Sequence, residues 1–447
     1  MYQAKEIDCL RRALKRLSGA NPNLPGFATE PDWGRIEAVL DTVAERMQDN
    51  YPYHHPLYAG QMLKPPHPIA RLAYALSLWV NPNNHALDGG RASSAMEKEL
   101  IPRLSAMWGW EECLGHLTGG GTMANLEALW VAGQLHPGRS LLGSSQAHYT
   151  HSRICSVLGL DYASIETDTE GRMDLGELEA ALASGSVGTV VVTMGNTGLG
   201  AVDPLPEILV LRERYDFRVH ADAAYGGYFG LSSKLADRTR RAFDSLNAAD
   251  SIVIDPHKHG LQPYGCGSIM FRDPSVGRFY KHGSPYTYFS SADLHLGEIS
   301  LECSRPGAAA VALWATMQLL PPEPRGEFAG MLDDCLDAAR SLHAALASSP
   351  SFSPVHTPEL DIVVYAATAA ATSEASKLAR EVFEAAADKD LHLALIELPV
   401  AMVADALPDS TRDSDSVTCL RSTLMKPEHA AWIDEIVSRL ETARNSV

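Results

Sequence analysis

The stretch FRVHADAAYGG, residues 217–227, points most directly to the fold. It begins with apolar and β-branched residues typical of a short buried strand and continues with an acid followed by small residues. Similar strand patterns occur at residues 140–143, 188–193 and 251–254, and amphipathic helical spacing separates them. Because alternating strands and helices are typical of a parallel sheet with crossover helices, we expect an α/β fold between about residues 100 and 270.

The sequence on either side of this region predicts two further parts. Apolar residues recur at helical spacing over residues 8–17 and 33–47, and residues 51–68, rich in Pro, His and Tyr, suggest an extended arm. A long Ala-rich helix is expected at 307–320, and the Pro-rich segment 321–324 after it marks a boundary. We therefore expect an N-terminal helical extension and arm (residues 1–68), a large domain (69–324) and a small C-terminal domain (325–447).

The composition argues against several classes of protein. The 447 residues include 37 Lys and Arg against 55 Asp and Glu, and a formal net charge of -18 without a basic run repels nucleic acids and anionic lipid. The sequence contains neither a signal peptide pattern nor the about 18 to 20 consecutive apolar residues that span a bilayer. The seven cysteines form no C-x-x-C pair. We expect a cytoplasmic protein that binds neither nucleic acid nor membranes.

A glycine-rich loop stands before the predicted helix that begins near Met123. The sequence Thr118-Gly-Gly-Gly-Thr122 lets the backbone approach an anion closely, and the start of a helix offers unpaired N–H groups. Gly120, Gly121 and Thr122 are therefore candidates for binding a phosphate. A glycine-rich turn without a ligand is the alternative interpretation.

Two charged residues follow predicted strands at the sheet edge where open parallel sheets bind ligands. Asp222 has only small side chains after it, which suits a flat aromatic ring with a basic nitrogen. Alternatively, it caps the next helix. Lys258 follows the strand at 251–254, where burial of the amine would favour its neutral form, a nucleophile toward an aldehyde. The flanking His257 and His259 weaken the alternative of a solvated surface lysine.

His148 and His151 lie three residues apart at the opening of a predicted helix, so they can share one of its faces. No Glu or Cys at a supporting spacing completes a metal site. We therefore predict no metal and favour a ring-stacking or core role for these histidines.

Taken together, these motifs resemble the group II amino-acid decarboxylases, which depend on pyridoxal 5'-phosphate (PLP) and have the aspartate-aminotransferase fold. The resemblance covers roughly residues 50–320 in order, with a weaker C-terminal part. It implies PLP-dependent transferase fold type I, with a mainly parallel seven-stranded sheet flanked by helices, a small α+β C-terminal domain and a helical N-terminal extension. It also implies PLP as the cofactor, an amino acid as the substrate and a homodimer with the active site near the subunit interface.

The resemblance assigns roles to individual residues. It implies that Lys258 forms a Schiff base with PLP and that Asp222 faces the pyridine nitrogen. His148 would stack above the ring, and Ala224 would pack beneath it. It also implies that the phosphate is bound by Gly120, Gly121 and Thr122, with help from His257 and Asp255. The family often has Asn in place of Asp255. Thr197 or Asn196 would contact the ring hydroxyl.

Two further roles are implied on the substrate side. Arg421 occupies the place of an arginine near the substrate, and its planar guanidinium suits a carboxylate. An ion pair at an interface is the alternative. Tyr286 or Tyr288, between Lys258 and the Ser304-Arg-Pro-Gly307 motif, would protonate Cα after carbon dioxide has left. Packing at a dimer interface is the alternative for these tyrosines.

These roles predict a carboxy-lyase that releases carbon dioxide and an amine from an L-amino acid. Loss of carbon dioxide leaves a carbanion, and a protonated pyridinium conjugated to the imine is the electron sink that it needs. The same sink also serves carbon–carbon lysis, transamination and decarboxylative oxidation to an aldehyde, which stay open. A PLP-fold protein that binds a partner without catalysis is a further alternative. The sequence does not indicate which amino acid is the substrate.

Overall fold

The computed structural model describes residues 3–25, 30–281 and 294–447. Its centre is a seven-stranded sheet in the order β1-β7-β6-β5-β4-β2-β3. The strands are β1 Leu114–Thr118, β2 Ser140–Ser144, β3 Tyr162–Ile165, β4 Val187–Thr193, β5 Arg218–Asp222, β6 Ser251–Ile254 and β7 Gly267–Phe271. The neighbouring pairs from β6 to β3 are parallel, and β7 runs antiparallel to β6 and β1. The predicted mainly parallel seven-stranded sheet is confirmed.

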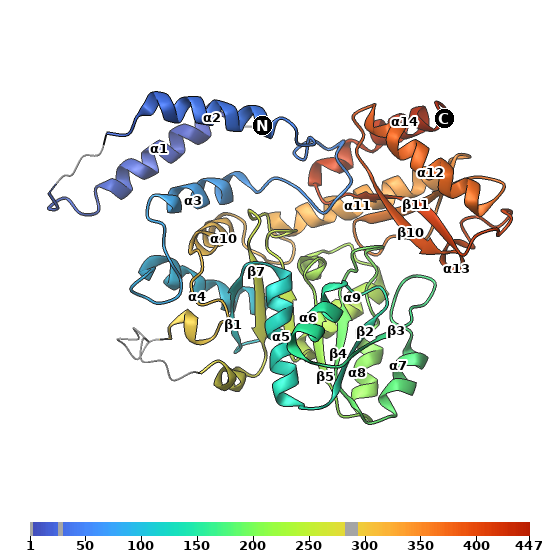
Figure 1. The fold of residues 1–447 in the computed structure, drawn as a ribbon, viewed down its shortest axis with the longest axis horizontal. Coiled ribbons are helices and arrows are strands. Elements are labelled where there is room, and N and C mark those ends of the chain that lie inside the picture. The colour runs from blue at the N-terminus through green and yellow to red at the C-terminus, as the bar shows by residue number, and fades with distance from the viewer. Residues whose placement is uncertain (1–2, 26–29, 282–293) are drawn as a thin grey trace.

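Helices cover both faces of this sheet because its strands carry apolar residues on both sides. Val191 of β4 belongs to the core cluster of Ile154, whereas its neighbours Val190 and Val192 belong to the cluster of Ile208 on the opposite face. The helices that connect the strands are α5 Gly121–Leu135, α6 Thr150–Leu158, α7 Leu175–Leu182, α8 Leu205–Arg212 and α9 Asp237–Asp244, and Figure 1 shows them around the sheet.

Five further helices lie beside the sheet and along one side of the molecule. They are α1 Ala4–Ser18, α2 Trp33–Met47, α3 Pro68–Leu78, α4 Arg91–Ser105 and α10 Ala308–Leu319. Helix α3 packs on α10, and α10 packs on α4. Figure 1 shows α1 and α2 outside α3, and neither α1 nor α2 has a buried residue. An ion pair of 2.8 Å between Arg71 and Glu6 joins α3 to α1.

The C-terminal part has a four-stranded antiparallel sheet in the order β10-β11-β9-β8. Its strands are β8 Phe352–Pro354, β9 Ile362–Ala367, β10 Ala394–Pro399 and β11 Ser416–Thr423, and its helices are α11 Glu327–Ala347, α12 Thr372–Ala387, α13 Val400–Val403 and α14 Ile433–Arg444. This composition agrees with the α+β character implied by the resemblance. The domain limits at residues 68 and 324 stay predictions. None of the helices in the described residues has both the length and the hydropathy to cross a membrane.

Candidate active site

The chemistry-bearing residues gather where several strands of the large sheet end. The last residues of β4 and β5, Thr193 and Asp222, pair in register, and Asp222 also pairs with Val253 of β6. These strand ends and the loop after β1 open into one cavity of about 500 Å³. All of the residues predicted to bind the cofactor line it: Gly120, Gly121, Thr122, His148, Thr197, Asp222, Ala224, Asp255, His257 and Lys258.

The glycine loop between β1 and α5 has a shape that only glycine allows. Gly120 has φ +149°, and a Cβ on Gly121 would lie 2.7 Å from Asp255 Oδ2. The Thr118 hydroxyl accepts from Gly120 N over 3.3 Å and so fixes the loop. The start of α5 therefore presents its backbone N–H groups to the cavity without side chains in the way.

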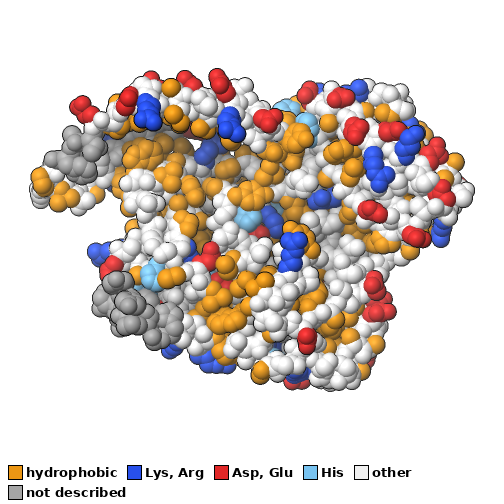
Figure 2. All heavy atoms as spheres, viewed as in Figure 1, with side chains coloured by type: hydrophobic (Ala, Val, Ile, Leu, Met, Phe, Trp, Pro, Cys, Tyr) orange, Lys and Arg blue, Asp and Glu red, His pale blue; other side chains and the backbone are white. Residues whose placement is uncertain are grey.

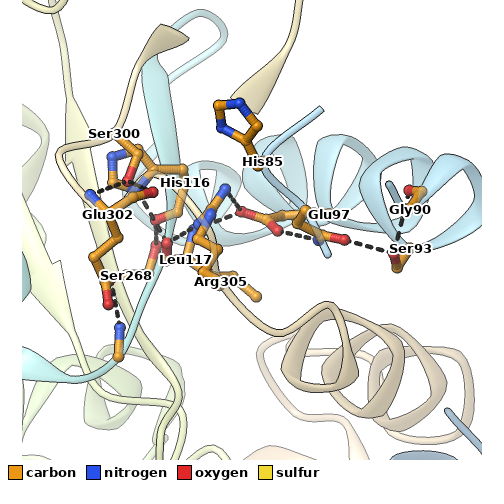
Figure 3. A network of polar contacts seen from close by, with 12 residues as sticks. His85, Gly90, Ser93, Glu97, His116, Leu117, Ser268, Ser300, Glu302 and Arg305 are labelled. Carbon is orange, nitrogen blue, oxygen red and sulfur yellow. Dashed lines mark hydrogen bonds and ion pairs between the residues drawn. The ribbon is translucent and has the colours of Figure 1, made fainter. Parts of the chain in front are cut away.

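A polar network, buried around Glu97 and Arg305, supports this loop (Figure 3). Glu302 accepts from Gly119 N over 2.8 Å. Arg305 donates to the carbonyl of Leu117 and pairs with Glu97 over 2.7 Å, and Glu97 in turn accepts from Leu117 N over 2.9 Å. Arg305 belongs to the predicted Ser304-Arg-Pro-Gly307 motif, so this motif supports the end of β1.

Asp222 is a buried carboxylate with three hydrogen-bond donors. His151 Nε2 lies 2.8 Å from Oδ2, Asn125 donates to Oδ2 over 3.3 Å, and Ala224 N donates to Oδ1 over 3.1 Å. Burial raises the pKa of Asp222, but the hydrogen bond from His151 and the charge of Lys258 outweigh burial, so the pKa lies below its ordinary value. Asp222 is therefore ionised at neutral pH and suited to pair with a cationic nitrogen.

Lys258 lies in the turn after β6 and faces the same cavity. Its Nζ is 3.0 Å from Asp255 Oδ2, and its side chain is 19% exposed. Asp255 Oδ1 is buried without a hydrogen-bond partner among the described residues. His257 Nδ1 donates to the carbonyl of Cys266 over 2.7 Å, which leaves Nε2 facing Asp255 at 3.6 Å. Burial lowers the pKa of His257.

The other wall of the cavity carries His148 and Thr197. His148 Nδ1 accepts from Thr150 N over 3.3 Å and lies 2.8 Å from the Thr150 hydroxyl. Burial lowers the pKa of His148. Asn196, considered with Thr197 for the ring hydroxyl, instead donates to the carbonyl of Gly171 over 3.0 Å. Thr197 is therefore the better placed of the two.

A family model described as the pyridoxal-dependent decarboxylase conserved domain matches residues 130–368, more than half of the chain. The chain belongs to this family. The L-aspartate decarboxylase of Thermococcus kodakarensis is 28% identical over 334 residues, which are 74% of this chain and 84% of that relative.

Solved structures agree with this fold. The apo crystal structure of mouse CSAD has a TM-score of 0.80 at 21% identity, with 99% of both chains covered. The structure of Oryza sativa TDC with PLP and tryptamine has a TM-score of 0.78 at 16% identity, covering 100% of this chain and 99% of that chain. The protein is a PLP-dependent carboxy-lyase with the α/β fold that the sequence predicted.

The described residues of this decarboxylase fit PLP. The glycine loop leaves space where a Cβ on Gly121 would meet Asp255, and unpaired N–H groups at a helix start suit a phosphate. Asp222 is ionised for a ring nitrogen, and Lys258 supplies a primary amine in the same cavity. The hydrogen-bond donors of the site suit an organic phosphate ester. The described residues contain no group of three His, Cys, Asp or Glu arranged to hold a metal.

Of the residues predicted for the substrate side of the decarboxylase, the structure describes Arg421. Arg421 is on β11, outside the cavity lining, with 6% of its surface exposed. Its Nε and Nη2 have no hydrogen-bond partner in the described part of the chain. Its charge acts on Tyr225, which lines the cavity. Tyr286 and Tyr288 lie outside the described residues.

Sequence reasoning missed several members of this site. Asn125 was unassigned, although it lies on the helix that the glycine loop opens. His220 holds Asn125, with Nε2 2.8 Å from Asn125 Oδ1. Tyr225, which lines the cavity, donates to Asp361 over 2.6 Å. His151 was considered as a metal ligand, a ring-stacking residue or a core residue. Its spacing of three residues from His148 indicated that the two histidines share a helix face. Nothing in the sequence indicated that Asp222 is its partner.

Proposed function

We propose that this decarboxylase converts an L-amino acid into the corresponding amine and carbon dioxide, with Lys258 as the residue that binds PLP covalently. The observation that carries the proposal is that Lys258, Asp222, His148 and the glycine loop line one cavity. They come from four separate segments of the chain. Chance gathering of an amine, an ionised acid and a phosphate-binding loop is a poor alternative.

Each wall of the cavity has a task in this proposal. Bound PLP supplies the electron sink that stabilises the carbanion left by loss of carbon dioxide. Gly120, Gly121 and Thr122 hold the phosphate, and Asp222 keeps the ring nitrogen protonated. His148 covers one face of the ring, Ala224 packs on the other face, and Thr197 contacts the ring hydroxyl.

Asp255 has a different task from the one that the resemblance implied. A carboxylate beside a phosphate is repelled by it, whereas Asp255 lies within 3.0 Å of the Lys258 amine. We therefore propose that Asp255 holds the amine of Lys258 in the cavity before the cofactor arrives. His257 keeps its proposed place on the phosphate side, because its Cε1 would lie 3.4 Å from a Cβ on Gly120 of the glycine loop.

Arg421 is proposed to bind the carboxylate of the substrate. A buried guanidinium without a hydrogen-bond partner is costly, and a carboxylate is the ligand that relieves this cost most fully. Its electrostatic interaction with Tyr225, which lines the cavity, supports an approach from that side. Protonation of Cα by Tyr286 or Tyr288 also stays a proposal.

We also propose that the enzyme is a homodimer. Helix α2 presents exposed apolar side chains, and the end of α3 adds more (Figure 2). The exposed residues are Trp33, Ile36, Val39, Leu40, Val43, Met47, Leu78, Trp79 and Val80. An apolar face of this kind is typical of a protein interface, and a second copy of the chain is the partner that the resemblance implies.

The test is a product analysis with a panel of L-amino acids that includes aspartate and aromatic amino acids. We expect the wild-type protein with PLP to release carbon dioxide and one matching amine, detected by mass spectrometry. Lys258→Ala should abolish turnover. A keto acid as the main product would indicate transamination, an aldehyde decarboxylative oxidation, and a cleaved side chain carbon–carbon lysis. Each of these results would contradict simple decarboxylation. Undiminished turnover by Lys258→Ala would reject the assignment of Lys258.

A further inference from the structure

His151 on α6 contacts Asp222 directly. It precedes Asp222 in the sequence, whereas Lys258 follows it. Its Nε2 lies 2.8 Å from Asp222 Oδ2, and the side chains of His151 and Asp222 are 0% and 6% exposed. Because water is excluded from this contact, the hydrogen bond acts in a low dielectric and strongly affects the charge of the carboxylate.

The surroundings of the His151 ring indicate where its proton lies. Nδ1 is buried and has no hydrogen-bond partner within residues 3–25, 30–281 and 294–447. A proton on Nδ1 would leave a buried donor unpaired, whereas a proton on Nε2 is accepted by the carboxylate. His151 therefore acts as a donor toward Asp222.

The other groups around Asp222 interact with it less closely than His151 does. Asn125 from α5 donates to the same oxygen, but over 3.3 Å, and the backbone of Ala224 donates to the other oxygen over 3.1 Å. Both ring nitrogens of His220 on β5 are hydrogen-bonded to other residues, Asn125 and Ser251. Lys258 acts on Asp222 through its charge from the cavity side and lowers the pKa of the carboxyl group. Asp222 in turn opposes the effect of burial on the pKa of His148. Of the three hydrogen bonds to Asp222, the one with His151 is the shortest.

We propose that His151 is a positioning residue for the reaction: by donating to Asp222 Oδ2, it keeps this carboxylate ionised and in one orientation, so that the ring nitrogen of PLP stays protonated. The inference rests on the proposed function, because it takes Asp222 as the partner of that nitrogen. It goes beyond that function by assigning a second residue to the control of the electron sink.

A merely structural role is the competing explanation, since the same bond fastens α6 to β5. The two explanations differ in what they change. A structural bond affects thermal stability, whereas a positioning bond affects the electronic state of the bound cofactor. A positive ring nitrogen withdraws electrons from the group that joins PLP to Lys258, so losing that charge raises the pH at which the visible absorption of the bound cofactor titrates.

The experiment compares His151→Leu with His151→Gln, which keeps an N–H donor, and with Ile154→Ala. Ile154 is buried on the same helix and makes only apolar contacts in its core cluster, so its loss loosens α6 without touching Asp222. We measure the absorption titration, the dissociation constant of PLP from the apo-protein, kcat, KM and the melting temperature.

We expect His151→Leu to move the titration midpoint upward by about one pH unit, weaken PLP binding, and lower kcat by roughly ten- to a hundred-fold with KM nearly unchanged, the range for losing a hydrogen bond to a charged group. His151→Gln should recover most of these losses. Ile154→Ala should lower the melting temperature and leave the titration midpoint in place.

A His151→Leu protein that is less stable but has the wild-type midpoint and PLP affinity would overturn this inference and leave the proposed function intact. Absence of PLP binding by the wild-type protein would overturn both. If His151→Leu does not fold, ¹⁵N NMR of imidazole-labelled wild-type apo-protein decides. A proton on Nε2 of His151 supports the inference, and a proton on Nδ1 overturns it.

Discussion

At the residue scale, the guanidinium of Arg421 combines deep burial with unused donors. Arg421 is 6% exposed, and Nε and Nη2 have no partner among the described residues. Burial lowers the pKa of Arg421, while the nearby Tyr225 and Asp361 oppose that change. An unpaired charge at this depth is retained more readily when a ligand completes its hydrogen bonds.

Replacing Arg421 by Met should therefore raise KM for the amino acid by about ten- to a hundred-fold, because a hydrogen bond to a charged group is lost. Arg421→Lys should be intermediate, since an ammonium cannot bind a carboxylate with two parallel bonds. The PLP dissociation constant should stay at its wild-type value. Arg380→Met serves as the control, because Arg380 already donates to Thr418 within the same part of the molecule. An unchanged KM in Arg421→Met would remove Arg421 from the substrate site.

Single residues were predictable from the sequence when a short local pattern carried them. Asp222 and Lys258 follow apolar strands directly, and the glycine loop precedes a helix. The partners of Asp222 were not predictable in this way. His151 and Asn125 lie 71 and 97 residues before it, and their contacts depend on how α5 and α6 pack on the sheet.

At the scale of elements, the turn from β1 into α5 depends on the small size of Gly121. Gly121→Ala should weaken PLP binding by at least roughly tenfold, because the new Cβ would lie 2.7 Å from the Asp255 carboxylate and displace the loop or the acid. Fluorescence titration of the apo-protein with PLP measures this. Gly330→Ala in α11 is the matched control, since nothing lies within 4 Å of a Cβ there. PLP affinity equal to wild type in Gly121→Ala would contradict the phosphate loop.

The contact between β1 and α5 also predicts a pH dependence of stability. His116 Nδ1 donates to the carbonyl of Leu117, so its Nε2, 2.9 Å from Glu127, accepts a proton that Glu127 holds. Burial raises the pKa of Glu127 from 4.5 to about 8. Between these values Glu127 holds a proton in the folded state and not in the unfolded state, so its own contribution to the free energy of unfolding falls as pH rises. Burial lowers the pKa of His116 well below 6.5, which offsets the Glu127 contribution below that pH, so for the pair the fall lies between about 6.5 and about 8.

Glu127→Gln should lose this part of the pH dependence, because Gln has no proton to give up. Urea denaturation at pH 5.5 and pH 8 measures it, and the loss of stability between the two should be smaller than in the wild type. Glu384→Gln, at an exposed position of α12, should behave like the wild type. Equal pH dependence of Glu127→Gln and wild type would show that Glu127 is ionised in the folded protein.

The sequence predicted elements best where burial is continuous. β4 and β6 are apolar runs buried over their whole length, and both were predicted. β1 and β11 were not predicted, because buried polar residues such as His116 and Arg421 interrupt their apolar pattern. β7 was also missed, and its antiparallel course does not follow from a strand–helix alternation. Such strands are specified by their neighbours more than by their own residues.

At the scale of the whole molecule, the exposed apolar face of helix α2 tests the proposed homodimer. Val39→Asp should dissociate the dimer, because it places a charge in the middle of the exposed apolar face of α2. Light scattering after gel filtration measures the mass. Val210→Asp on α8 is the matched control, since Val210 is 57% exposed and Val39 is 56% exposed. A wild-type monomer, or dissociation by Val210→Asp as well, would contradict an interface built on the apolar face of α2.

The most direct test of the account is to locate PLP on the chain. Borohydride reduction of the enzyme with PLP, followed by digestion and mass spectrometry of the peptides, identifies the lysine that carries the cofactor. Lys426 is a demanding internal control, because burial lowers its pKa to about 7 and makes it a reactive amine as well. We predict the modification on the peptide that contains Lys258. Modification of Lys426 or Lys64 with Lys258 left unmodified would contradict the account.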